Sequence, residues 1–287
     1  MHEQAETRRF ARRRASNLMS LLFVVLLASL SVAILLVIVG HIFANGLSSL
    51  TLDFFTKIPK PYGEDGGGIA QAIVGTIEML LLAGLMAIPV GVATAIYLVE
   101  FGSGRFAKTV GFAIELLAEL PSIVVGVFVW ALLVRNVTGY SGIAGSTALA
   151  IIMIPIIARS VEEILKLVPN GLREAALALG TPRWKVVLFV VVPTVLPGIL
   201  TGIMLSLARA AGETAPLLLT SLGNNFFNFN LQKPMAAMPL QIYNYAVSPY
   251  DDWHRKAWAS TLVLIAIVAI MSGAVKFLTR RWKHESN

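Results

Sequence analysis

The chain reads Arg-Glu-Ala-Ala-Leu-Ala-Leu-Gly-Thr-Pro-Arg-Trp-Lys-Val-Val-Leu-Phe-Val-Val-Val-Pro from residue 173 to residue 193. The first half of this stretch is charged and lies between long apolar runs, so it must face water while its neighbours avoid it. Pro169 predicts the start of a short helix, and Gly180 predicts its end. Thr181 and Pro182 predict a second helix, as its N-cap and its first helical residue.

The composition indicates an integral membrane protein. Of the 287 residues, 56% are hydrophobic and 14% are charged, and the mean hydropathy is +0.76, which is far from the values of a soluble domain. The net charge of +7 fits Lys and Arg at the cytoplasmic ends of spans better than it fits nucleic acid. The chain has no cysteine, and its four histidines are not spaced for a metal site, so we expect no metal and no cofactor.

Six apolar runs are long enough to cross a bilayer, since about 20 residues are needed. Lys and Arg gather in the segments that would then be cytoplasmic, which predicts that both termini lie inside. The predicted organisation is a cytoplasmic tail, a first span, an extracytoplasmic loop, a core of five spans and a second cytoplasmic tail, at residues 1–17, 18–40, 41–68, 69–280 and 281–287. The core spans are expected near 69–98, 110–134, 143–165, 197–219 and 257–277, with the polar loop at 166–193.

Prolines predict bends in this core. Residues 186–222 would extend about 54 Å as one helix, well beyond a bilayer core of about 30 Å. We therefore expect a bend at Pro193 and Pro197, with the span proper running from Pro197 to Leu219. A short interfacial helix is expected around residues 239–243, where Tyr243 suits the headgroup level.

Charged residues remain inside the predicted spans. Arg209 lies near the middle of the membrane and Glu213 follows four residues later, on the same helical face. With Gly198, Gly202 and Ser206 they form a stripe that predicts a closely packed interface or a polar pathway. The Arg fork suits an oxyanion and Glu213 would keep binding weak, although the pair could instead only neutralise itself and lock two helices.

A second group of polar residues lies in the third span. For Glu115 and Glu119 we expect partners such as Arg159 or a facing subunit. Ser122 could donate a hydrogen bond to a substrate, or could bond its own backbone, as serines in membrane helices often do.

The spacing of the polar loop is similar to a known motif. Glu174-Ala175-Ala176, three residues, Gly180, nine residues, Val190, one residue and Val192-Pro193 resemble the EAA loop of ABC-importer permeases, with valines in place of Ile and Leu. The resemblance implies an all-α membrane protein of the type I (MetI-like) permease architecture, with six transmembrane helices and both termini inside. It also implies a coupling helix that seats in a groove of a cytoplasmic ATPase, through Arg173, Glu174, Ala175, Ala176, Gly180 and Pro182.

A second segment narrows the family. Arg209-Ala210-Ala211-Gly212-Glu213-Thr214 resembles the Arg-x-x-Gly-Glu-Thr segment of phosphate-importer permeases, in particular the PstA type. The resemblance implies a multi-pass subunit of the bacterial cytoplasmic (inner) membrane that contacts lipid and translocates inorganic phosphate. The implied partners are a PstC-type permease, two cytoplasmic ATPase subunits and an extracytoplasmic phosphate-binding protein. The implied pathway residues are Arg209, Glu213, Ser206, Thr214 and Ser122.

Other functions stay open at this point. An importer of another oxyanion, such as molybdate or sulfate, would share the architecture. A stand-alone secondary anion transporter would use Arg209, Glu115 and Glu119 as coupling charges, but would have no need of an ATPase-docking loop. We do not expect an enzyme, because the sequence has no paired nucleophile and base, and no Gly-x-x-x-x-Gly-Lys-Ser/Thr loop that would hydrolyse ATP.

Single cysteines test the predicted sidedness, since the chain has none of its own. Asn230→Cys and Lys283→Cys are expected to react with a membrane-impermeant maleimide from opposite sides of the membrane. Labelling of both positions from the same side would contradict the six-span arrangement.

Overall fold

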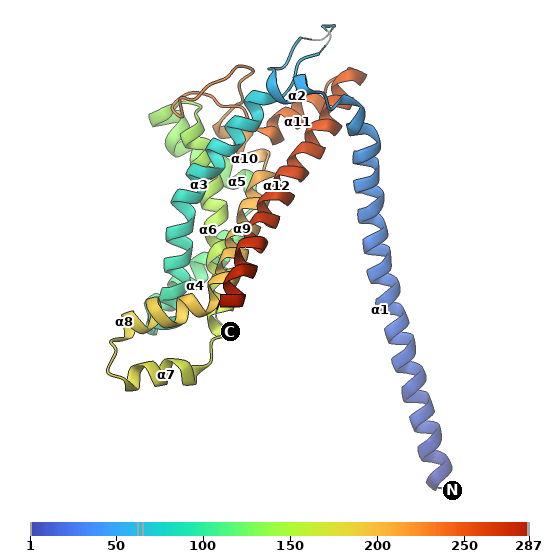
Figure 1. Ribbon diagram of the computed structural model, residues 1–287, viewed down its shortest axis with the longest axis vertical. Helices are drawn as coiled ribbons and strands as arrows, with labels where there is room; N and C mark the ends of the chain where they lie inside the picture. The colour runs from blue at the N-terminus through green and yellow to red at the C-terminus, as the bar shows by residue number, and fades with distance from the viewer. Residues whose placement is uncertain (1, 62, 65, 286–287) are drawn as a thin grey trace.

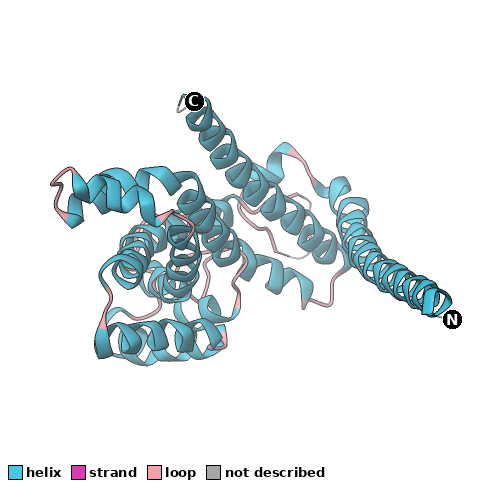
Figure 2. Ribbon diagram, turned by 90° about the horizontal axis from the view of Figure 1, so that it is seen from below, coloured by secondary structure: helices cyan, strands magenta, loops and turns pink. Residues whose placement is uncertain are grey.

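A computed structural model describes the backbone of residues 2–61, 63–64 and 66–285 and the side chains of residues 13–14, 16–61, 63–64 and 66–277. This part of the chain is almost entirely helical (Figures 1 and 2). In chain order its elements are α1 (His2–Gly46), η1 (Leu47–Ser49), α2 (Leu52–Thr56), α3 (Ala70–Ile96), η2 (Tyr97–Phe101), α4 (Gly104–Glu119), α5 (Ser122–Val129), η3 (Trp130–Thr138), α6 (Gly142–Lys166), α7 (Asn170–Ala178), α8 (Arg183–Val186), η4 (Val187–Val191), α9 (Val192–Ala211), α10 (Ala215–Thr220), α11 (Met238–Ala246) and α12 (Asp251–Glu285).

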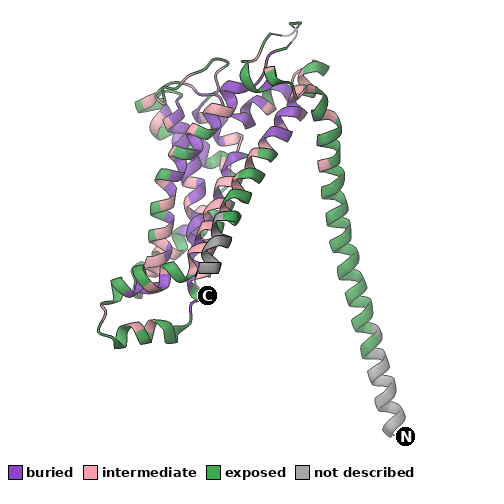
Figure 3. Cartoon of the chain, in the orientation of Figure 1, coloured by how far each residue is buried: buried purple, intermediate pink, exposed green. Residues whose placement is uncertain are grey.

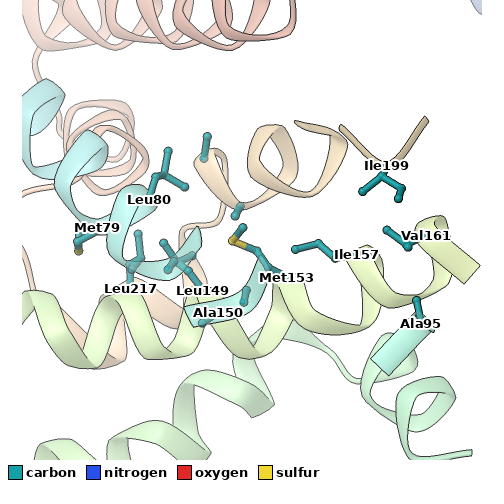
Figure 4. Packing of buried hydrophobic residues seen from close by; sticks show 14 of the residues in the cluster. Met79, Leu80, Ala95, Leu149, Ala150, Met153, Ile157, Val161, Ile199 and Leu217 are labelled. Atoms are coloured by element: carbon teal, nitrogen blue, oxygen red, sulfur yellow. The ribbon is translucent and has the colours of Figure 1, made fainter. Parts of the chain in front are cut away.

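Helix α6 lies at the centre of the bundle, against α3 and α9. Its 25 residues correspond to a length of about 37 Å at 1.5 Å per residue. Figure 4 shows part of the core, where Met153 and Ile157 of α6 lie near side chains from the neighbouring helices. Gly91 of α3 allows a close approach, because a side-chain carbon there would lie 2.8 Å from Cβ of Ile157.

The predicted stripe on α9 packs against α6 over its first three members. A carbon added at Gly198 would lie 2.8 Å from Cγ2 of Ile164, and one added at Gly202 would lie 2.7 Å from Cβ of Ser160. The Ser206 hydroxyl donates a hydrogen bond of 3.4 Å to the Met153 carbonyl. This half of the stripe is therefore a close helix–helix contact made by small residues.

Helix α1 stands apart from the bundle over most of its length (Figures 1 and 3). Its apolar stretch is unburied, and it meets α12 only near its last turns, where the rings of His41 and Trp258 lie 5.0 Å apart. Gly46 lets the two backbones approach, since a carbon there would lie 2.9 Å from the Trp258 carbonyl oxygen.

The predicted number of six spans is not exact. Four helices within the described chain are long and apolar enough to cross a membrane, and a fifth crossing results if α4 and the α5–η3 helix count as one span. These two helices are bent by 104°, so the third span predicted at 110–134 is not one continuous helix. Pro121 is the cause, because it disfavours helical geometry for Leu120, whose ψ is 132°.

The span predicted from Pro197 to Leu219 is not one continuous helix either. Helices α8, η4 and α9 run without a break from Arg183 to Ala211, although Pro197 lies inside α9. The helix ends instead at Gly212, and α10 begins at Ala215 with a proline in its first turn. Pro lacks an N–H and suits the first turn of a helix, so Pro216 favours a new helix over the continuation of α9.

Other predicted boundaries shift by several residues. Residues 2–17 of the predicted tail continue α1, and α1 runs to Gly46 into the predicted loop at 41–68. Residues 281–285 of the second predicted tail continue α12, while residues 1 and 286–287 lie outside the described part. The expected interfacial helix at 239–243 is α11, whose Met238 N–H donates a 2.7 Å hydrogen bond to the Thr76 hydroxyl of α3.

A glycine substitution tests the α6–α9 contact. Gly202→Ala is expected to destabilise the protein by roughly 1–3 kcal/mol, because the new methyl group overlaps Ser160. Thermal unfolding of the purified protein in detergent measures the change. The matched control is Gly111→Ala in α4, which has open space around it and should gain about 0.5–1 kcal/mol from its better helix propensity. Equal stability of the two variants would contradict the packing described above.

Candidate functional site

The polar loop forms two short helices at one end of the bundle (Figure 1), called here the α7 end. Helix α7 begins after Pro169, and the Gly180 N–H closes its last turn with a 2.9 Å hydrogen bond to the Leu177 carbonyl. Gly180 has a φ of +79°, a conformation that glycine adopts without strain. The predicted start and end of this helix are confirmed. Helix α8 begins one residue later than predicted, because Pro182 itself occupies the N-cap position with a ψ of 145°.

Most of the predicted coupling residues lie on the surface. Glu174, Ala175, Gly180 and Pro182 are exposed, whereas Ala176 is half-buried and packs on the core. None of the nine residues of α7, all of which the structure describes, is buried (Figure 3). Apolar side chains share this surface, namely Leu167, Leu177, Leu179 and Trp184. A surface of small, apolar and charged residues at the end of a helical bundle is suited to contact with another protein.

Arg173 differs from the other predicted coupling residues, because its side chain turns inward. Its Nε and Nη2 donate hydrogen bonds of 3.0 and 2.7 Å to Oε1 of Glu100. The Arg173 side chain is 17% exposed and that of Glu100 is 5% exposed, so the ion pair is almost completely buried. Arg173 also donates to the carbonyls of Leu165 and Val168, at the end of α6. It therefore ties α7 to η2 and to α6.

The sequence analysis missed Glu100. Its partner lies 73 residues away along the chain, a separation that no local pattern reveals. One signal was present: Glu100 is a lone carboxylate at the end of the apolar run of α3, directly before Phe101. A buried carboxylate requires a partner, so its position alone indicated a contact with a distant basic residue.

A second group of charges joins α4 to α6. Arg159 forms ion pairs with Glu115 of α4 and, at 3.0 Å, with Glu162 of its own helix. Lys166 extends the network with a 2.7 Å contact to Glu162. The predicted pairing of Glu115 with Arg159 is confirmed, whereas Glu119 is exposed. These charges link α4 to the central helix.

The predicted pathway residues gather around the break between α9 and α10, with one exception. Nε of Arg209 lies 3.8 Å from Oε1 of Glu213, and these side chains are 61% and 16% exposed. Glu213 lies beyond the end of α9, so the two do not share one helical face. Thr214 is half-buried at the N-cap of α10. Ser206 is the exception, because it is fully buried and bonds α6.

Ser122 lies on the neighbouring element. It is half-buried and is the first residue of α5, directly after the break at Pro121. Helix α5 packs on α10, since a carbon added at Gly126 would lie 2.7 Å from Cα of Pro216. The second turn of α5 therefore lies against the first turn of α10. Within the described residues, no cluster of three or more His, Cys, Asp or Glu side chains could hold a metal ion.

The chain is similar to known proteins along most of its length. Residues 87–284 match the family model of the binding-protein-dependent transport system inner membrane component. The chain is 39% identical over 241 residues to the phosphate transport system permease protein PstA of Yersinia pestis, covering 84% of this chain and 82% of that protein. It is 40% identical over 242 residues to PstA of Xylella fastidiosa, covering 84% of both chains.

Solved structures share the fold. A chain of the MetNI methionine ABC transporter in an inward facing conformation aligns with a TM-score of 0.64 at 20% identity, over 74% of this chain and 95% of that one. A chain of a bacterial alginate ABC transporter aligns with a TM-score of 0.65 at 14% identity, over 91% and 94%. The apolar helices and the inner-membrane family agree on a multi-pass protein of the cytoplasmic membrane. The chain belongs to the binding-protein-dependent transport system inner membrane component family, among its PstA-type permeases.

Proposed function

We propose that the chain is the transmembrane permease subunit of an ATP-driven importer that carries inorganic phosphate across the cytoplasmic membrane, with both termini inside. The observation that carries this proposal is the similarity to phosphate transport permeases over 84% of the chain. Molybdate and sulfate permeases would need the same architecture, but the relatives reported above are named for phosphate. A stand-alone secondary transporter is a weaker alternative, because it gives no role to the exposed surface of α7.

The α7 end is the proposed contact with the cytoplasmic ATPase subunits, of which we propose two per importer. Glu174, Ala175 and Gly180 are exposed there, and small residues allow a partner to approach closely. At the opposite end the importer would receive phosphate from an extracytoplasmic binding protein. ATP hydrolysis is assigned to the partner subunits, and this chain transmits their movement.

The proposed substrate contact is Arg209. Its guanidinium offers the planar pair of donors that an oxyanion accepts, and it keeps its charge at any physiological pH. Glu213 lies 3.8 Å away and competes for those donors, which keeps the site weak enough for release. The hydroxyls of Thr214 and Ser122 are the further donors of this proposal. Ser206 has a different part in this proposal, because its hydroxyl already bonds α6 and it supports the helix that carries Arg209.

Arg209 also indicates that the pathway is shared with another subunit. An Arg side chain that faces lipid inside the membrane is costly, so it faces protein or water instead. In this chain its side chain is 61% exposed. We therefore propose that a homologous PstC-type permease covers this face and completes the pathway.

Removal of Arg209 tests the substrate site. Arg209→Ala is expected to reduce ATP-dependent uptake of radiolabelled phosphate by roughly 10- to 100-fold, the effect of about 1.5–3 kcal/mol from a charge-assisted hydrogen bond. The assay uses vesicles that carry the complete importer, and co-purification of the ATPase subunit verifies assembly. Arg105→Ala, on the exposed face of α4, is the control. Normal uptake by Arg209→Ala would exclude a substrate contact, and uptake of sulfate or molybdate in place of phosphate would reassign the substrate.

A substitution at Gly180 tests the ATPase contact. Gly180→Asp adds a charge to the exposed turn and about 1–2 kcal/mol of backbone strain, because φ is +79°. Loss of the ATPase subunit, or ATP hydrolysis without phosphate uptake, is the expected result. Gly63→Asp is the control: Gly63 has a φ of +89°, also has open space around it, and lies in the exposed loop between α2 and α3. If both variants behave alike, strain rather than docking explains the effect.

A further inference from the structure

Glu100 is a carboxylate buried at the end of a transmembrane helix. It belongs to η2, the π-helical turn that follows α3, and the residue is 4% exposed. Such turns are rare and occur frequently at functional sites. A charge is removed from water at high cost unless it is paired and hydrogen-bonded, so the contacts of Glu100 are the reason that it is tolerated there.

Those contacts come from the polar loop. Both oxygens of Glu100 accept from Arg173, at 3.0 and 3.3 Å from Nε, and Oε1 also accepts from Nη2 at 2.7 Å. Nη2 also donates to the Leu165 carbonyl at 3.0 Å. The Arg173 side chain therefore holds η2, the end of α6 and α7 in one place.

The next residue of η2 contacts the other helix of the loop. The guanidinium carbon of Arg183 in α8 lies 5.6 Å from the centre of the Phe101 ring. Two adjacent residues of η2, Glu100 and Phe101, thus each contact an arginine, one from α7 and one from α8. The two contacts differ in strength, because Phe101 is 41% exposed and exposed cation–π contacts are weak, whereas a buried pair is costly to separate.

We propose that Glu100 is the positioning residue that transmits the movement of α7 to α3, and this inference rests on the function proposed above. When a partner displaces α7, Arg173 cannot leave Glu100 without leaving a buried charge unpaired. The displacement therefore moves η2 together with α7. Since η2 continues α3 without interruption, and α3 packs along α6, the movement reaches the core of the bundle.

Glu100→Gln tests this role. The amide keeps the shape of the side chain but removes the charge that holds Arg173. In the complete importer reconstituted in liposomes, the number of phosphate ions imported per ATP hydrolysed is expected to fall by about 10-fold, with the ATPase subunit still bound. Arg173→Lys, which keeps the charge but loses the fork, is expected to give an intermediate decrease. Glu163→Gln is the control, because Glu163 is an exposed carboxylate near the same end of α6.

A distance measurement gives a second readout that does not depend on the transported substrate. Spin labels at Ala178→Cys in α7 and Ala93→Cys in α3, both exposed positions, are expected to give a narrow distance distribution in the assembled complex. Glu100→Gln should broaden it and Glu163→Gln should not.

An unchanged distance distribution, or an unchanged ratio of phosphate imported to ATP hydrolysed, would overturn the proposal. Loss of the ATPase subunit from the Glu100→Gln complex would also overturn it, since Glu100 would then only maintain the docking surface. Absence of phosphate uptake by the native complex would contradict the proposed function alone, because the distance measurement would still decide the role of Glu100.

Discussion

The close approach of α3 and α9 to α6 is the contact on which the other parts of the structure depend. Apolar side chains gain little from association in lipid, so helices associate there mainly through close packing. Glycines at positions 91, 198 and 202 remove the side chains that would keep the backbones apart. The remaining elements are placed by this packing: α10 continues beyond α9, η2 continues α3, and the loop that contains α7 continues α6.

At the α7 end, ion pairs join elements where the apolar core ends. The core ends where α6 meets the polar loop, and there the Arg173–Glu100 pair joins three elements whose backbones diverge. A few residues earlier, Arg159 and Glu162 of α6 hold α4 through Glu115. Both networks attach neighbouring elements to α6. The apolar core thus packs the helices of the bundle together, and the charged networks attach the elements at the α7 end.

Local signals in the sequence predicted local structure correctly. Pro169 and Gly180 marked α7 because caps act within one turn, and the apolar runs marked most of the helices. The breaks were harder to predict. Pro121 and Pro216 were visible, but a proline is compatible with a kink, a helix start or a helix end, and the surrounding packing decides between them. Glu100 was missed for another reason, because its environment is made by residues from a distant part of the chain.

Ser206 and Arg209, three residues apart on α9, show the limit of predicting contacts from the spacing of residues. Ser206 and Arg209 belong to one predicted stripe, yet Ser206 is fully buried against α6 while Arg209 extends away from the packed face. A spacing of three residues turns the side chains by about 300°, that is, 60° short of a full turn. This rotation places Arg209 at the edge of the α6–α9 contact, whereas Ser206 lies within it. A charge at the edge of a transmembrane bundle requires a polar environment, which the proposed second subunit and the proposed substrate would supply to Arg209.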